Sequence, residues 1–190
     1  MSLRGSALVV VLASLTPLPL FAQVDYRILA TNKTSTAQKE MNEAADAGYR
    51  FGGVMGGETT FGGSEVVTVM YRRAGEDKGR FAYKLLATTK TSTMQKEMQE
   101  AGDAGYEYKG QTVYSSLLGG REVVIVLELD NDREGRPSYE YRLLAAKKTS
   151  TLQKELSEAG AAGYEFVGLT VAGTAMGGSE MVAILRKVRP

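Results

Sequence analysis

The chain has 190 residues, and its 23 lysines and arginines nearly balance its 22 aspartates and glutamates. Nucleic-acid binders carry a basic excess or patch, so this balance predicts a protein with no nucleic-acid partner. Histidine and cysteine are absent, which excludes disulfides, Ser-His-Asp and Cys-His catalytic triads, and zinc or haem held by these residues.

The first part of the chain resembles an export signal. Arg4 is the only charged residue before Gln23, and an apolar run follows it over residues 7–15. A basic start, a short apolar run and a small residue, Ala22, before the cleavage point are typical of a secretory signal peptide. We therefore expect residues 1–22 to be removed and the mature chain to be periplasmic or secreted. The run is shorter than the about 20 residues that span a bilayer, which argues against a retained anchor and against stable membrane insertion after signal removal.

Three copies of one unit make up the rest of the chain. They begin at Tyr26, Tyr83 and Tyr141 and read YRILATNKTSTAQKEMNEAADAGYRF, YKLLATTKTSTMQKEMQEAGDAGYEY and YRLLAAKKTSTLQKELSEAGAAGYEF. Self-similarity at a fixed period indicates a repeat architecture. We assign the repeats to residues 23–73, 81–130 and 138–190, which are joined by charged, glycine-containing linkers.

Each copy is predicted to fold as a β-α-β-β unit. A short apolar strand opens the copy and ends at a Lys-Thr-Ser-Thr sequence, where a helix begins. The serine has a glutamine three residues later, which is the spacing of a capping box. These pairs are Ser35 and Gln38, Ser92 and Gln95, and Ser150 and Gln153. Apolar residues then recur at helical spacing along one face of the helix.

The end of each helix and the hairpin after it are marked by glycine. Gly48, Gly105 and Gly163 are expected to end the three helices in the left-handed conformation. Two more strands follow, at about 49–55 and 65–72 in the first copy, and a glycine-rich hairpin loop joins them.

The third strand of each unit predicts how the units pack. Residues 123–127 and 181–185 are apolar on both faces, so each strand must be buried on both. We expect this strand at the centre of an antiparallel sheet, with the unit's own helix on one face and the sister copies on the other. The predicted fold class is α+β, with three tandem β-α-β-β repeats, helices on the outer face and one pseudo-threefold body. Separate beads on a string are the alternative, which the apolar second faces disfavour.

Some of these residues resemble a known family. LQKEL over 152–156 and AGAAGYEF over 159–166 in the third copy, and EAGDAGYEY over 100–108 in the second, resemble the bacterial domain-of-unknown-function family numbered 4177. Tyrosine stands where that family has tryptophan, and Arg50 replaces the glutamate in the first copy. The resemblance implies a strand, a helix and a hairpin in each unit. It brings no known activity and no catalytic residues.

The Lys-Thr-Ser-Thr sequences are candidate anion sites. Free backbone amides and the helix dipole favour anions at a helix start, and a lysine and hydroxyls stand beside them. The residues concerned are Lys33, Thr34, Ser35, Lys90, Thr91, Ser92, Lys148, Thr149 and Ser150. The alternative is that these residues only cap the helices and that the lysines are solvated. No metal site and no cofactor is expected.

Two functions remain open from the sequence. The first is a non-enzymatic binding or structural module that contacts a protein or a small, anionic ligand. The alternative is a hydrolase that uses paired glutamates as general acid and base. The candidate glutamates for that chemistry are Glu65, Glu107, Glu122, Glu165 and Glu180. Without histidine, such an enzyme would need a glutamate with a strongly raised pKa.

Overall fold

The computed structural model describes residues 24–59, 63–75, 78–115, 121–173 and 178–189. These residues form nine strands and three helices. The predicted signal peptide and the predicted hairpin loops over 60–62, 116–120 and 174–177 lie outside the described residues.

Three similar units follow one another along the chain. The first unit contains β1 (Val24–Thr31), α1 (Thr34–Asp46), β2 (Arg50–Thr59) and β3 (Gly63–Arg73). The second unit contains β4 (Phe81–Thr88), α2 (Thr91–Asp103), β5 (Glu107–Ser115) and β6 (Arg121–Asp130). The third unit contains β7 (Ser138–Ala146), α3 (Thr149–Ala161), β8 (Glu165–Gly173) and β9 (Ser179–Arg189). Each unit forms an antiparallel sheet in the order β1-β3-β2, β4-β6-β5 or β7-β9-β8, which confirms the predicted central strand.

The helices end where the glycines predict. Gly48 has a φ of 88°, and its N–H donates to the carbonyl of Ala45 at 2.9 Å. The N–H of Tyr49 donates to the carbonyl of Ala44, also at 2.9 Å, which completes a Schellman motif. Gly105 and Gly163 end α2 and α3 with the same backbone geometry. A residue without a Cβ is needed there because the left-handed backbone crowds any side chain.

The helix starts differ from the prediction. Each helix is preceded by its lysine in an extended backbone conformation, with no hydrogen bond from a side chain that caps the first turn. The predicted capping boxes are therefore wrong. Gln38 and Gln95 instead accept hydrogen bonds from the backbone of the following unit. A strand edge of the next unit offers unpaired N–H and C=O groups, and the side-chain amides satisfy them.

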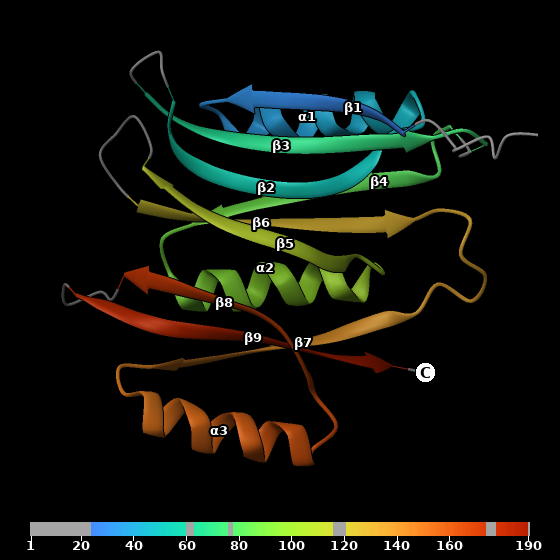
Figure 1. The fold of residues 1–190 in the computed structure, drawn as a ribbon. Coiled ribbons are helices and arrows are strands. Elements are labelled where there is room, and N and C mark those ends of the chain that lie inside the picture. Colours follow the sequence, from blue (N-terminus) through green and yellow to red (C-terminus); the bar gives the residue numbers. More distant parts are fainter. Residues whose placement is uncertain (1–23, 60–62, 76–77, 116–120, 174–177, 190) are drawn as a thin grey trace, which may run out of the picture.

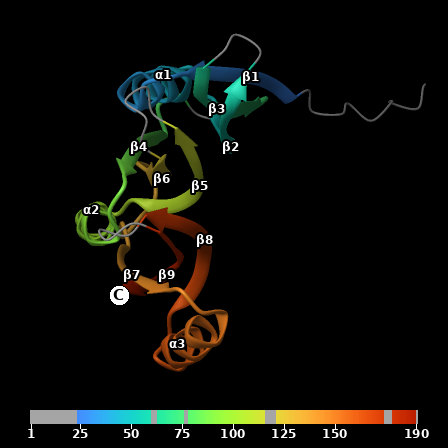
Figure 2. The ribbon, with the colours of Figure 1, turned by 90° about the vertical axis from the view of Figure 1, so that its left-hand side faces the viewer.

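The units pack together as expected, but in a row rather than around a threefold axis (Figures 1 and 2). α1 packs on its own sheet and on β4 of the second unit, and α2 packs on its own sheet and on β7 of the third. The expected pseudo-threefold body with all helices on its outer face is therefore wrong. α1 and α2 lie between units, where each also covers the edge strand of the next unit. A row of this kind has two ends.

The core confirms that both faces of the central strand β6 are covered, one by the unit's own helix and the other by the preceding unit. In β6, Ile125 and Leu127 pack with α2, while Val124 lies with Val66 of the first unit. Val126 packs with Met41 of α1 in a further cluster. The side chains of residues 123–127 are buried, as predicted from their two-sided apolar pattern.

Candidate functional site

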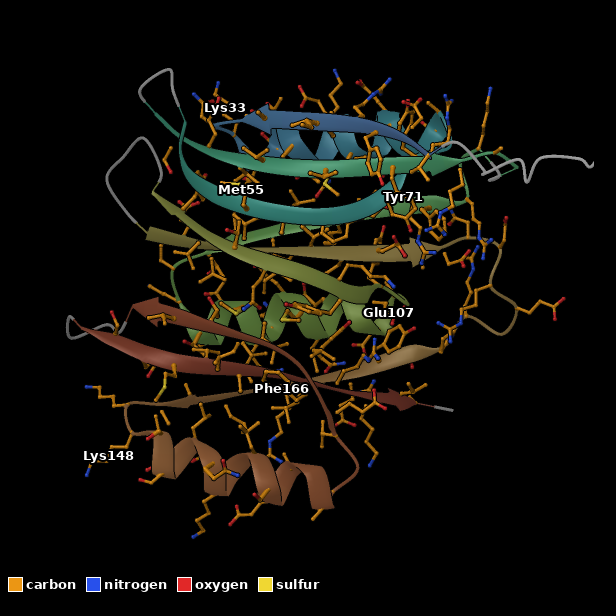
Figure 3. The ribbon with its side chains drawn as sticks, in the orientation of Figure 1. Lys33, Met55, Tyr71, Glu107, Lys148 and Phe166 are labelled. Atoms are coloured by element: carbon orange, nitrogen blue, oxygen red, sulfur yellow. The ribbon has the colours of Figure 1, made fainter. Side chains whose placement is uncertain are left out.

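Exposed apolar side chains lie at the two ends of the row. On the first unit they are Tyr26 and Ile28 of β1 and Met55 of β2, and on the third unit they are Phe166, Leu169 and Val171 of β8. We call the first set, with the sheet face around it, the N-terminal end surface. The β8 set, with the outer face of α3, is the C-terminal end surface. Figure 3 shows Met55 and Phe166 on their separate units.

The tyrosine position of the N-terminal end surface is buried where a preceding unit covers it. Tyr26 is 66% exposed, whereas Tyr83 and Tyr141, at the same position of the later units, are 2% exposed. The exposure therefore follows from position in the row and not from residue type, since all three are tyrosines. Each end surface is half of an interface that occurs between the units.

The helix side of that interface uses amide side chains. In the first interface, the Nδ2 of Asn42 donates to the carbonyl of Tyr83 at 2.9 Å, and the N–H of Tyr83 donates to Asn42 Oδ1 at 2.9 Å. The N–H of Leu85 donates to Gln38 Oε1 at 2.9 Å. The helix thus takes the place of a neighbouring strand along the outer edge of β4.

The second interface repeats this arrangement. Gln95 donates to the carbonyl of Tyr141 at 2.8 Å and accepts from the N–H of Leu143 at 2.8 Å. Gln99 accepts from the N–H of Tyr141 at 3.0 Å and donates to the carbonyl of Tyr139 at 3.2 Å. The corresponding residues of α3, Gln153 and Ser157, are exposed and bond only within their own helix.

Tyrosine hydroxyls hold the strand side of the interface. The Tyr83 hydroxyl accepts from the N–H of Phe51 at 2.8 Å and donates to Glu128 Oε2 at 2.8 Å. The Tyr141 hydroxyl accepts from the N–H of Tyr108 at 2.6 Å in the same way. Burial raises the pKa of Tyr83 and of Tyr141, and Glu128 adds to the shift at Tyr83. Both hydroxyls therefore stay protonated.

Charged residues cross the two interfaces with opposite polarity. Arg50 of the first unit binds Glu128 of the second at 3.1 Å, and Glu128 is 3% exposed. At the next interface, Glu107 of the second unit binds Arg186 of the third. Lys109 bridges both carboxylates, at 3.0 Å from Glu107 and 3.3 Å from Glu128. These residues adjoin a cleft of about 300 Å³, lined in part by Arg50, Glu107, Glu128, Arg133 and Tyr139.

This cleft brings Glu107 and Glu128 together, but Glu107 is not in a state suited to acid catalysis. Glu107 and Glu128 are directly opposite each other on β5 and β6. Burial opposes ionisation of Glu107, yet the hydrogen bonds and charges of Lys109 and Arg186 outweigh it, so the pKa of Glu107 lies below its usual value. A glycosidase acid needs a raised pKa. The candidates Glu65, Glu122 and Glu180 lie on β3, β6 and β9, one in each sheet.

The structure places the predicted anion residues at three separate helix starts. Lys33 and Lys148 lie at opposite ends of the row (Figure 3). All three lysines are exposed. Thr91 donates a hydrogen bond to Glu180 of the third unit at 2.9 Å, so a carboxylate occupies the second start. The nine predicted residues form no common site, and anion binding at each start stays a prediction.

Sequence reasoning missed the residues that join the units. The first-strand tyrosines were visible as the first letter of each copy, and the glutamines recur at one helical position. Local patterns assigned the glutamines to capping and left the partner of the tyrosines unassigned. Asn42 and Gln99 lie one turn after the glutamines. A polar stripe of amides beside an apolar stripe was the signal that could have located the interface.

Comparison with protein-family models, curated proteins and solved structures finds no match to this chain. The resemblance to the family numbered 4177 therefore stays a prediction from its motif. Among the described residues, no helix is long and apolar enough to cross a membrane. The part of the chain described by the structure also contains no cluster of three or more acidic residues placed to hold a metal ion.

Proposed function

We propose that this chain is a non-enzymatic structural module that binds protein through its two end surfaces. The observation that carries the proposal is the exposure of Tyr26 at a position that is buried between the units, together with the other exposed apolar side chains of the two end surfaces. Large exposed apolar surfaces on a soluble domain are typical of protein contacts. The hydrolase alternative receives less support, because Glu107 and Glu128, which face each other in the cleft, are held by lysine and arginine.

Site-specific photo-crosslinking in the producing cell tests this function. A photoreactive residue at Ile28 or at Phe166 should capture a protein, because both side chains stand on the end surfaces. The control position is Lys39, a residue of α1 outside the two end surfaces whose side chain is 77% exposed. If the end positions capture no more protein than position 39 does, the end surfaces are not binding surfaces and the proposal fails.

The proposal includes export and the family resemblance. A signal peptide over 1–22 would deliver the module outside the cytoplasm, as the pattern from Arg4 to Ala22 predicts. Intact-mass measurement of the protein outside the cytoplasm should give a chain that begins at or near Gln23. A mass that still includes residues 1–22 would contradict cleavage at this point. Membership of the family numbered 4177 would add no activity, in keeping with a structural role.

A further inference from the structure

One interface occurs twice within the chain, and each end of the row carries one half of it. α1 and β2 contact β4 and β5, and α2 contacts β7 while β5 contacts β8. α3 and β8 offer the first half of this interface again, and β1 and β2 offer the second half. We propose that the C-terminal end surface of one copy binds the N-terminal end surface of a second copy, so that copies join head to tail. This inference rests on the proposed function and names the protein that the end surfaces bind.

The apolar parts of the two surfaces correspond to the parts that meet within the chain. In the first interface, Met41 of α1 packs with Phe81, Tyr83 and Val126 of the second unit. The position of Met41 is occupied in α3 by Leu156, which is only half-buried. The positions of the other three are occupied in the first unit by Val24, Tyr26 and Val69. These three residues line a hollow of about 460 Å³ on the N-terminal end surface, together with Gly52, Gly53, Tyr71 and Arg73.

The polar groups also correspond, with one difference. Gln153 stands at the position of Gln38 and Gln95. The side-chain oxygens of those two glutamines accept hydrogen bonds from the backbone N–H groups of Leu85 and Leu143, each two residues after the first-strand tyrosine of the next unit. On the N-terminal end surface that residue is Ile28. Ser157 replaces Asn42 and Gln99, and a hydroxyl can make only part of the double contact of an amide. The contact between copies should therefore be weaker than the contacts between units.

A small residue permits the close approach of helix and strand. A Cβ added at Gly102 of α2 would lie 2.4 Å from the carbonyl oxygen of Tyr139 in the next unit, so this position must stay small. Gly160 is the same position of α3, and a Cβ added there meets nothing within 4 Å. The space in front of Gly160 is thus free for the strand of another copy. In α1 the position is Ala45, which is buried, so alanine is also tolerated.

The charges permit this pairing. The position of Arg50 and Glu107 is occupied in the third unit by Glu165, which is exposed. The position that faces it across the interface is filled by Glu128 in the second unit and by Arg186 in the third, and it is Tyr71 in the first unit. The guanidinium of Arg73 lies 5.3 Å from the centre of the Tyr71 ring. Glu165, which pairs with Arg186 at 3.2 Å within its own unit, would therefore meet a phenol and a cation.

The two surfaces differ, so the contact is heterologous. A heterologous contact leaves a free surface of each kind on every dimer, and growth continues until a ring closes or a filament forms. The expected product is an assembly larger than a dimer. A symmetric dimer would use one surface twice and would stop at two copies.

The test is sedimentation velocity of the purified protein over a range of concentrations up to about 1 mM, which covers weak specific binding. The mass of the wild-type protein should rise beyond that of a dimer. Gly160→Arg should stay monomeric, because the side chain fills the space for the strand. Arginine is a better helix former than glycine, so Gly160→Arg keeps the fold.

Two further variants make the test directional. Ile28→Asp blocks the other end surface, so it too should be monomeric alone. An equimolar mixture of Gly160→Arg and Ile28→Asp should form a dimer and nothing larger, because each partner keeps one intact surface. Ser157→Gln restores the amide and should lower the concentration needed for assembly at least severalfold, while Lys154→Gln on the solvent side of α3 should leave it unchanged.

The outcomes show whether head-to-tail assembly fails alone or together with the proposed function. A wild-type protein that is monomeric at every concentration overturns head-to-tail assembly, and so does assembly that Gly160→Arg leaves intact. If photo-crosslinks at Ile28 and Phe166 then join the chain to a different protein, the proposed function still stands. If those positions capture nothing, the function fails as well.

Discussion

Asn42 exchanges two hydrogen bonds with the backbone of Tyr83, one through each atom of its side-chain amide. Tyr83 lies on β4, which is an edge strand of the second sheet. Edge strands expose N–H and C=O groups that must be paired or hydrated. Here a helix of the preceding unit supplies the partner groups, and this explains why the row is built with helices against strands rather than strand against strand.

Gln95 and Gln153 provide a matched test of this role. Gln95→Ala should lower the free energy of unfolding by about 1–3 kcal/mol, because it leaves two backbone groups at the interface without partners. Gln153→Ala changes the same residue type at the same helical position, but on the open face of α3. It should change the stability by no more than about 0.5 kcal/mol. Urea melts at low protein concentration measure both, and equal effects would contradict the role of the amides.

Tyr83 and Tyr26 form a second matched pair. Tyr83→Phe removes a hydroxyl that accepts from Phe51 and donates to the buried Glu128. We expect a loss of about 1–3 kcal/mol, because a buried carboxylate oxygen and the part-buried N–H of Phe51 lose their partner. Tyr26→Phe should be neutral within about 0.5 kcal/mol in the monomer. Thermal melts in which the two variants behave alike would show that the hydroxyl does not hold the interface.

Acid should weaken the contact between the second and third units through Glu107. Its pKa is lower in the folded protein than its ordinary value of 4.5, since Lys109 and Arg186 outweigh the effect of burial. A lowered folded pKa gives stability that is present above 4.5 and is lost as the pH falls through the folded pKa. Glu107→Gln should therefore be less stable than the wild type at neutral pH, and the difference should shrink in acid. Urea melts at several pH values measure it, and a constant difference down to low pH would contradict the assignment.

Local patterns were sufficient to predict the units but not how they meet. Gly48 acts within its own helix, so its role follows from its spacing in the sequence. The strand over 123–127 has apolar residues on both faces, and this pattern shows that both faces are covered without showing by which element. The ion pairs that join the units link residues far apart in the sequence, such as Arg50 with Glu128, 78 positions apart. No spacing rule relates such residues. The end surfaces were not predicted for the same reason, because their exposure depends on which neighbour is missing.

The second unit should not be stable as a separate fragment. Within the chain, β6 packs Ile125 and Leu127 with α2 and the third unit, and Val126 with α1 of the first unit. A fragment of residues 82–130 would expose the apolar face that contains Val124 and Val126, and a unit of that size buries too little surface to compensate. We expect it to be poorly folded or to self-associate, and we expect the intact protein to unfold in one cooperative transition. Circular dichroism melts and sedimentation of the fragment measure this. A monomeric fragment with the melting temperature of the intact protein would show that the units are independent, and the shared cores would then contribute little to stability.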